Sequence, residues 1–228
     1  GLEGISAKNG TLVMGTMVRQ AVVERDPLVT EHCPLLKQTL RYVGPPATKN
    51  RGTVGGSLAH ADPLAELPGA ALVLGAEYVV ESTSGRRTLT PDEFYIAELT
   101  TALETGEMLR EIRFPKSGSS TRTAFVESSS RAEGLAIAGV ACSLELDSVG
   151  SCRSIGLAAI GVGPRPTRLV SAEQVLSGEE TIPNSIKAAA EASANDIEPL
   201  DDIHATAHYR RRLTVALVGR AIDQALAA

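Results

Sequence analysis

One short run of glycine and hydroxyl residues is better suited than any other part of this sequence to holding a ligand. It spans residues 50–57 and reads NRGTVGGS. Glycine has no Cβ and accepts positive φ, so backbone N–H groups can come close to a phosphate, while Thr and Ser hydroxyls add donors. The run therefore predicts a loop that cradles the diphosphate of a dinucleotide, using Thr53, Gly55, Gly56 and Ser57.

The same run has a plainer interpretation, because a Gly–Gly pair also marks an ordinary turn. It does not match the GxGxxG signature, which requires a βαβ context, and the lysine of GxxxxGK[ST] has no counterpart here. On local chemistry alone, phosphate binding and a simple turn both remain open.

Ser57, His60 and Asp62 have the residue types of a hydrolytic triad. Three such residues so close in the chain cannot easily converge on one point, and the sequence has no nucleophile elbow. We predict that no residue of this chain acts as a catalytic acid, base or nucleophile.

The composition limits the possible classes of function. Of the 228 residues, 43% are apolar and 21% charged, and the formal net charge of −5 does not suggest a nucleic-acid partner. No apolar run is long enough to span a membrane, and the first residues lack the layout of a signal peptide. We therefore expect a cytoplasmic protein without a membrane span.

The cysteines are Cys33, Cys142 and Cys152. An odd number without CxxC spacing argues against a disulfide framework and against a metal site. We expect reduced thiols, and any iron–sulfur ligands must lie on another chain.

The glycine run lies between two predicted helices. A helical pattern over residues 27–43 is stopped by Gly-Pro-Pro at 44–46, because glycine caps a helix and proline cannot continue it. Beyond the run, Asp62 and Pro63 can supply the N-cap and first-turn proline of a second helix, with Glu66 in its first turn. Strand-like stretches at 12–15, 77–81, 88–90 and 108–114 complete a unit that ends near residue 115.

A polar connector at residues 116–120 leads to a second unit. Its strand-like stretches are separated by turn residues and predict a small antiparallel sheet, which helices follow. The strands are expected at 123–129, 135–146 and 152–162, and the helices at 171–176, 182–194 and 205–227. The predicted fold class is therefore α+β, in two domains, residues 1–115 and 120–228.

With its flanks included, the glycine run resembles a known family. Residues 49–68, KNRGTVGGSLAHADPLAELP, closely resemble the second FAD-binding loop of the flavin (medium) subunits of molybdenum hydroxylases, of the carbon monoxide dehydrogenase and xanthine dehydrogenase type. Three further segments match in order: EMLREIRFP at 107–115, AIAGVA at 136–141 and YRRRL at 209–213. On these collinear matches the chain is identified as a member of the family.

The resemblance implies a fold in several parts. The family's flavin domain has two small α+β subdomains with FAD between them, followed by a C-terminal domain of a three-stranded antiparallel sheet with helices. Residues 1–115 correspond to the second subdomain and residues 120–228 to the C-terminal domain. The first subdomain, which carries the family's other glycine loop of the Ala-Gly-Gly type, is expected to be missing from this sequence.

The resemblance also assigns residues to the cofactor. Residues 53–57, Val54 included, should face the diphosphate, and Glu66 takes the place of an acidic residue that hydrogen-bonds the ribityl or ribose region. Leu109 occupies a position near the isoalloxazine, and Phe125 matches an aromatic position close to the flavin. The plainer alternatives are a first-turn carboxylate favoured by the helix dipole for Glu66, and core packing for Leu109 and Phe125.

The sequence departs from the family pattern near the flavin. Thr48 stands where relatives often carry an apolar residue against the ring, and Gly134-Leu135 replaces a common Asp-Phe pair. The arginines at 210–212 point in different directions on a helix, so we expect them to make subunit contacts or to be solvated.

The function implied by the resemblance is that of an FAD-dependent oxidoreductase subunit. Electrons pass from [2Fe-2S] clusters on a small partner subunit through FAD to an acceptor, and the molybdenum cofactor lies on a large partner subunit, in a dimer of heterotrimers. FAD is then the only cofactor of this chain, whose residues hold and tune it. Two alternatives stay open: a stand-alone flavoenzyme of the fold group of vanillyl-alcohol oxidase and the cell-wall precursor reductase, and a non-catalytic docking module without flavin.

Overall fold

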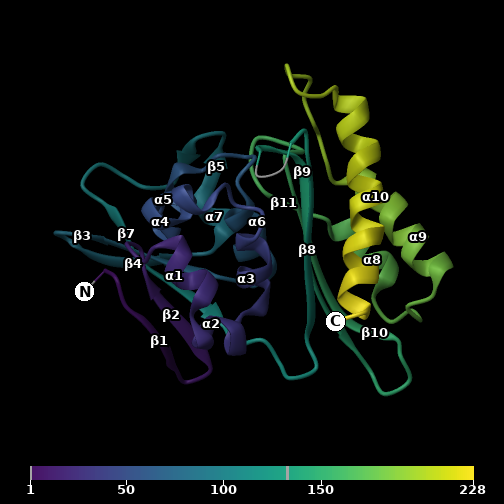
Figure 1. The fold of residues 1–228 in the computed structure, drawn as a ribbon, viewed down its shortest axis with the longest axis horizontal. Coiled ribbons are helices and arrows are strands. Elements are labelled where there is room, and N and C mark those ends of the chain that lie inside the picture. Colours follow the sequence, from purple (N-terminus) through teal and green to yellow (C-terminus); the bar gives the residue numbers. More distant parts are fainter. Residues whose placement is uncertain (1, 132–133) are drawn as a thin grey trace.

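The computed structural model describes residues 2–131 and 134–228, and this part of the chain is arranged in four layers. Figure 1 shows a sheet at one end, a layer of short helices, a second sheet, and an outer layer of helices. The short helices are therefore enclosed between two sheets. The α+β class predicted from the sequence is confirmed.

The first sheet is antiparallel, in the order β1-β2-β7-β3-β4. Leu12, Met14, Ile112 and Phe114 are completely buried against the helices, because alternate side chains of β2 and β7 point to that face. A separate pair, β5 (Tyr95–Ala97) and β6 (Thr100–Thr101), lies outside this sheet. The strands of the sheet are β1 (Ile5–Lys8), β2 (Thr11–Gly15), β3 (Glu77–Ser82), β4 (Gly85–Leu89) and β7 (Met108–Pro115).

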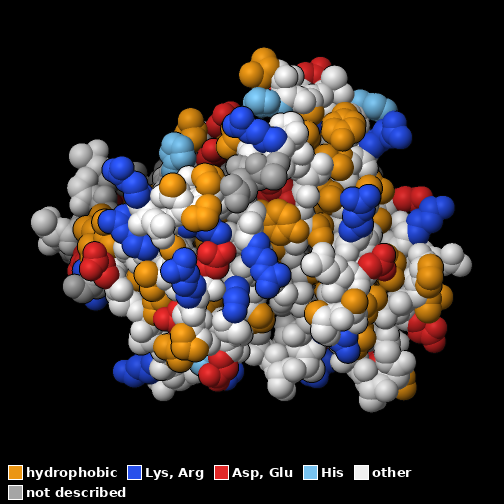
Figure 2. Space-filling model, in the orientation of Figure 1, with side chains coloured by type: hydrophobic (Ala, Val, Ile, Leu, Met, Phe, Trp, Pro, Cys, Tyr) orange, Lys and Arg blue, Asp and Glu red, His pale blue; other side chains and the backbone are white. Residues whose placement is uncertain are grey.

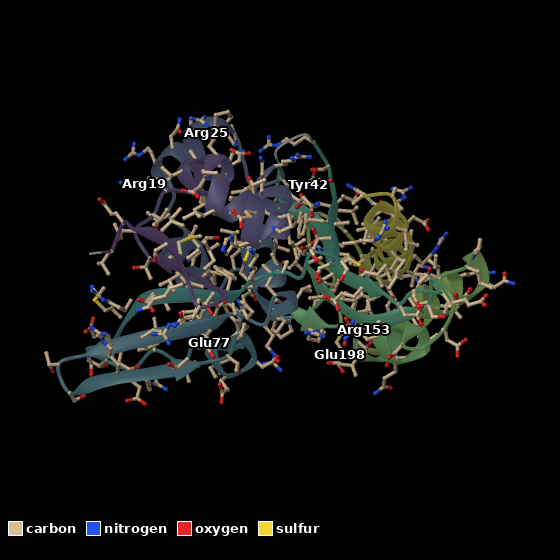
Figure 3. The ribbon with its side chains drawn as sticks, turned by 90° about the horizontal axis from the view of Figure 1, so that it is seen from below. Arg19, Arg25, Tyr42, Glu77, Arg153 and Glu198 are labelled. Carbon is tan, nitrogen blue, oxygen red and sulfur yellow. The ribbon has the colours of Figure 1, made fainter. Side chains whose placement is uncertain are left out.

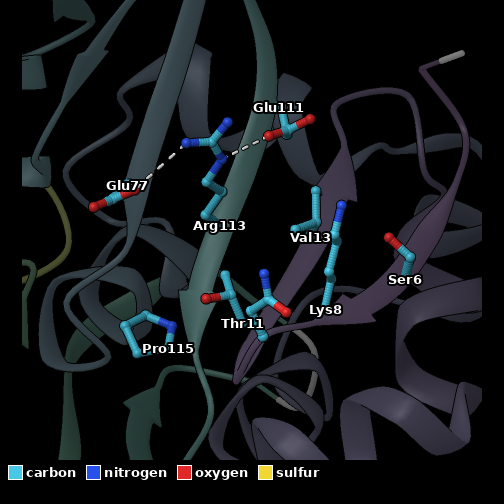
Figure 4. A pocket seen from close by; sticks show the side chains of 9 residues that line it. Ser6, Lys8, Thr11, Val13, Glu77, Glu111, Arg113 and Pro115 are labelled. Atoms are coloured by element: carbon cyan, nitrogen blue, oxygen red, sulfur yellow. Dashed lines mark hydrogen bonds and ion pairs between the residues drawn. The ribbon is translucent and has the colours of Figure 1, made fainter.

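The opposite face of this sheet carries a shallow cavity of about 530 Å³. Figure 4 shows Arg113 between two acidic side chains there: its Nε lies 2.7 Å from Oε1 of Glu111, and its Nη1 lies 3.8 Å from Oε2 of Glu77. Arg113 is thus paired with carboxylates of this cavity, and we assign the cavity no ligand.

The predicted helix at residues 27–43 is divided in two. Asp26 caps the first part by accepting a hydrogen bond from the N–H of Leu28 at 2.8 Å, and Pro34 begins the second part, since proline cannot continue a helix. The helix expected from Asp62 onwards starts only at Glu66, because Asp62 instead accepts from the N–H of Leu64 in a turn. The helices of this layer are α1 (Gln20–Arg25), α2 (Pro27–His32), α3 (Pro34–Leu40), α4 (Pro46–Arg51), α5 (Val54–His60), α6 (Glu66–Val73) and α7 (Pro91–Phe94).

The second sheet has the order β11-β10-β9-β8. The three predicted strands are present as β8 (Arg122–Ser129), β9 (Ala136–Leu146) and β10 (Cys152–Ile160). The expectation of three strands was incomplete, because the two-residue strand β11 (Thr167–Arg168) pairs with the end of β10. The helices that follow are α8 (Val170–Leu176), α9 (Pro183–Ala192) and α10 (Ala207–Leu226), with a 3₁₀ turn at Ser193–Asn195.

Both faces of the second sheet are buried. Phe125, Ala141 and Ile160 point towards the enclosed helices, whereas Val140 and Leu157 point towards α8, α9 and α10. Small residues allow the close approach on the inner side: a Cβ on Gly69 of α6 would lie 2.8 Å from a methyl carbon of Ile160. The two domains are thus joined by a packed apolar interface.

Two of the three consecutive arginines hold separate segments of the chain together by hydrogen bonds, an arrangement we call a clamp. Arg210 is only 2% exposed, donates to the carbonyl oxygens of Ile137 and Gly161, and lies 2.5 Å from Asp202, whose pKa it lowers to about 2. Arg211 donates to two carbonyls before α10, including that of Ile197 at 2.9 Å. The prediction of subunit contacts or solvated faces is therefore wrong for these two residues.

We expect Arg210→Met to lower the free energy of unfolding by about 3 kcal/mol, because it leaves buried carbonyl oxygens without a donor. Arg212→Met is the matched control: Arg212 is exposed on the same turn, and the change should stay within about 0.5 kcal/mol. Urea unfolding followed by circular dichroism measures both. Equal losses in the two variants would contradict the clamp.

Candidate functional site

The glycine run is not the loop expected from the sequence: it spans the end of helix α4, the caps Gly52 and Thr53, and the first turn of helix α5. Thr53 is the N-cap, and its Oγ1 accepts a hydrogen bond from the N–H of Gly56 at 3.1 Å. The N–H of Val54 donates to the carbonyl of Val18, and that of Gly55 to the carbonyl of Thr16. The N–H of Ser57 donates to the carbonyl of Thr53 at 3.1 Å, so four of the N–H groups expected to face a phosphate are already used within the chain.

Two of the three glycines of the run, Gly55 and Gly56, lack a side chain for different physical reasons. A Cβ on Gly55 would lie 2.3 Å from Cβ and 2.7 Å from the carbonyl oxygen of Thr16, so this position lets α5 rest directly on the turn after β2. A Cβ on Gly56 would lie 2.7 Å from Oγ1 of Thr53 and would disturb the cap. Gly55 therefore serves the packing of α5, and Gly56 keeps its first turn open.

A cleft of about 740 Å³ lies beside this first turn. Its walls come from the turn after β2, from α4, α5 and the start of α6, and from the connection between β8 and β9, so both domains contribute. Four of the predicted cofactor contacts line it: Thr53, Gly56, Ser57 and Glu66.

The other predicted contacts are buried and do not line the cleft. Val54 and Phe125 are 1% exposed, Leu109 is 5% exposed, and Gly55 is buried. Phe125 packs on Tyr42 with ring centroids 5.3 Å apart. Figure 3 shows Tyr42 at the boundary between the enclosed helices and the second sheet. A direct contact of these four residues with FAD stays a prediction, and their visible role is core packing.

Positive charge is present at the cleft. Arg19, Arg51 and Arg131 line it, and Arg19 also donates to the carbonyl of Arg51. Within the described residues, neither Arg19 nor Arg51 forms an ion pair with a carboxylate, so both guanidinium groups can serve an anion. Figure 2 shows basic side chains over the helical side of this domain. Sequence reasoning missed Arg19, which reaches the run only because its backbone pairs with Thr53.

Two partly buried carboxyl groups, Glu66 and Glu127, have raised pKa values. Burial, together with the nearby charge of Asp62, raises the pKa of Glu66 to about 7. Burial and the charge of Glu66 raise the pKa of Glu127, on β8, to about 8. Sequence reasoning missed Glu127, although a charged residue two positions after the inward-pointing Phe125 was an available signal.

The metal site, the thiols and the membrane span considered from the sequence can also be checked in the described ranges. Residues 2–131 and 134–228 contain no group of three His, Cys, Asp or Glu side chains that could hold a metal ion. Cys33, Cys142 and Cys152 are buried free thiols. None of the described helices is long and apolar enough to cross a membrane.

Comparison with known proteins identifies the family. Residues 1–117 match the FAD binding domain in molybdopterin dehydrogenase, and residues 123–225 match the CO dehydrogenase flavoprotein C-terminal domain. This chain belongs to the FAD-binding subunits of molybdenum hydroxylases. The membership and the cofactor FAD predicted from the sequence are thereby confirmed.

Curated relatives of this flavin subunit belong to several dehydrogenases. The chain is 31% identical to the 6-hydroxypseudooxynicotine dehydrogenase complex subunit alpha of Paenarthrobacter nicotinovorans, over 99% of this chain and 76% of that protein. It is 30% identical to the carbon monoxide dehydrogenase medium chain of Hydrogenophaga pseudoflava, over 99% and 78%.

Solved structures share the whole fold. Carbon monoxide dehydrogenase from Hydrogenophaga pseudoflava superposes with a TM-score of 0.96 at 32% identity, covering 99% of this chain and 78% of that one. Quinoline 2-oxidoreductase from Pseudomonas putida 86 gives a TM-score of 0.93 at 32% identity, covering 98% and 78%. The four layers described above are therefore those of a flavin subunit of this family.

Gly55→Ala should lower the free energy of unfolding by about 2–3 kcal/mol, because the added Cβ meets the backbone of Thr16, which has no room to move away. Gly219→Ala in helix α10 is the matched control: nothing lies within 4 Å of the added Cβ, so helix propensity should raise stability by about 0.5–1 kcal/mol. Denaturant titrations compare the two variants. A neutral Gly55→Ala would show that α5 does not depend on this contact.

The raised pKa of Glu66 predicts a pH-dependent stability. The folded chain binds this proton more tightly than the unfolded chain, where the pKa is near 4.5, so stability is lost as the pH rises from about 5 through about 7. Glu66→Gln should reduce that loss by on the order of 1–2 kcal/mol, as measured by urea unfolding at several pH values. Glu98→Gln, at an exposed carboxylate, should leave the loss unchanged.

Proposed function

We propose that this chain holds FAD in the cleft at residues 53–57 and passes electrons from iron–sulfur clusters on a partner chain to an acceptor. The observation that carries the proposal is the cleft itself: hydroxyl groups, unpaired arginines and Glu66 meet beside the first turn of α5, in a chain of a FAD-binding family. Bound FAD supplies the electron-transfer chemistry.

The lining fits a dinucleotide. The Thr53 and Ser57 hydroxyls and the guanidinium groups of Arg19 and Arg51 would hold the diphosphate, since charge-assisted bonds from arginine to phosphate are strong. The missing side chain of Gly56 leaves space beside them. Val54 and Gly55 would act indirectly, by fixing the position of the first turn of α5. Glu66 would bond the ribityl or ribose region, with Leu109 and Phe125 packed behind the ring system.

The names of the relatives support the proposed partner subunits. One relative is named as a subunit of a dehydrogenase complex, and another as the medium chain of carbon monoxide dehydrogenase. By analogy, the chain would work with a small iron–sulfur subunit and a large molybdenum subunit, in a dimer of heterotrimers. Its free cysteines support a cytoplasmic location, where thiols stay reduced.

The test is the flavin content of the full-length protein purified with its native partners. Ser57→Ala should weaken FAD binding about 5–10-fold, because one hydroxyl donor is lost without cost to the fold. Gly56→Val should abolish FAD retention, since its side chain enters the space beside Thr53. Visible absorbance and released flavin per chain measure both.

Ser148→Ala is the matched control, because Ser148 is exposed in the turn between β9 and β10, away from the cleft. It should retain wild-type flavin. Unchanged flavin in Gly56→Val would contradict the assignment of this cleft. A colourless wild-type protein that FAD cannot reconstitute would favour the docking module instead.

A further inference from the structure

A second cavity shares a wall with the FAD cleft. It has a volume of about 280 Å³, and Asp62 and Leu64 line both this cavity and the cleft. Its other walls come from the turn between β5 and β6, from the segment after β10 and from the segment before α10. Figure 1 shows β5 and the segment before α10 at the same end of the molecule. A molecule bound at this cavity would therefore lie next to the flavin.

The lining of this cavity is acidic. Among its described lining residues, Arg210 is the one basic side chain, and Arg210 already pairs with Asp202 at 2.5 Å. The nearby Arg165 donates to the carbonyl oxygens of Asp92 and Tyr95. Negative charge that the chain leaves uncompensated attracts a positively charged partner. The acidic residues of the lining are Asp62, Glu98, Asp201 and Asp202.

One buried donor in the lining has no acceptor. The side chain of Arg210 is only 3% exposed, and its Nε has no hydrogen-bond partner among the described residues. Its Nη groups, by contrast, donate to Ile137, Gly161 and Asp202. Buried polar atoms nearly always have a partner, so this one requires an explanation. A backbone carbonyl of a chain that inserts into the cavity would supply the acceptor.

Large apolar side chains are exposed on both sides of the cavity. Leu200 lines it and is 75% exposed, and Ile203, three positions further along, is 95% exposed. On the other side, Ile96 and Leu99 flank Glu98 in the β5–β6 hairpin, and both are more than half exposed. Exposed apolar groups gathered around polar ones are typical of an interaction site. We call the acidic lining and these four apolar side chains the acidic face.

We propose that the acidic face docks a basic redox protein, which takes electrons from the flavin. The inference rests on the proposed function, because it takes FAD as the ligand of the neighbouring cleft. Two molecules of a one-electron acceptor are reduced for each two-electron reduced flavin, and two protons are released to the solvent.

The charge and size of the acidic face favour a transient partner over a permanent subunit. Permanent interfaces are large and apolar, and their cores are depleted of charged residues. Redox proteins that leave after each transfer use small interfaces, and opposite charges speed their approach. Four carboxylates beside a small apolar group therefore suit repeated, brief encounters.

The test uses the full-length protein in complex with its native partners, and cytochrome c as the basic redox probe. Isothermal titration at low ionic strength measures the dissociation constant of the probe. Glu98→Lys should weaken binding about tenfold, because it replaces an attraction with a repulsion. Ile203→Ser should weaken binding about three- to tenfold, because less apolar surface is buried in the encounter.

Each variant has a matched control. Asp223→Lys makes the same change of net charge as Glu98→Lys, at an exposed position near the end of α10. Val149→Ser removes an apolar side chain that is exposed in the turn between β9 and β10. Both controls should bind cytochrome c within about twofold of the wild type.

Electron transfer supplies a second readout. The flavin is photoreduced without oxygen and mixed in a stopped-flow instrument with cytochrome c or with ferricyanide, a small anion. Glu98→Lys should slow transfer to cytochrome c about tenfold at low salt and should not slow transfer to ferricyanide. The difference from the wild type should shrink at high salt, because salt screens exposed charges.

The outcomes separate this proposal from the proposed function. If the wild type does not bind cytochrome c, or if Glu98→Lys and Asp223→Lys bind it equally, the acidic face is overturned and the FAD cleft stands. If the native partners protect Ile203→Cys from a thiol reagent, the face is a permanent subunit interface and the proposal is overturned as well. If the wild type holds no FAD, the proposed function itself fails.

Flavin content and thermal unfolding check the fold of each variant. Glu98→Gln, with an expected loss of about threefold, replaces Glu98→Lys if that variant does not fold. Leu200→Ser replaces Ile203→Ser in the same way.

Discussion

The close contact between helix α5 and Thr16 is the constraint on which the cleft depends. Because Gly55 has no side chain, α5 rests on the turn after β2, and the N–H groups of Val54 and Gly55 bond to that turn. This contact fixes the direction of the first turn, so Thr53 and Ser57 face the cleft while Val54 enters the core. A residue with a side chain at position 55 would displace Thr53 and Ser57 from the cleft.

The cleft also depends on the second sheet, whose two faces belong to two different hydrophobic cores. Alternate residues of β8, β9 and β10 pack on the enclosed helices and on α8, α9 and α10. The inner face covers the enclosed helices of the N-terminal domain. Arg131, Gly134 and Leu135 line the cleft together with residues of the N-terminal domain, so the cleft is complete only when both domains are in place.

The sequence predicts those features that depend on local pattern. Alternation of apolar residues gives the long strands of both sheets, and the polar connector at 116–120 separates them. Features that depend on contacts between residues far apart in the chain cannot be predicted from the local sequence pattern. The second half of the glycine run begins a helix that rests on the distant Thr16, and β11 forms through two pairs with β10. The side-chain directions of Arg210 and Glu127 depend equally on neighbours far along the chain.

The clamp at Arg210 also joins the C-terminal helix to the cleft. Arg210 donates to the carbonyl of Gly161 at 3.1 Å, and the N–H of Gly161 donates to the carbonyl of Pro63 at 2.9 Å, next to Asp62 in the wall of the cleft. These bonds link the first turn of α10 to the N-terminal domain. A change that displaces this turn of α10 would therefore also displace the backbone beside Asp62 at the rim of the cleft.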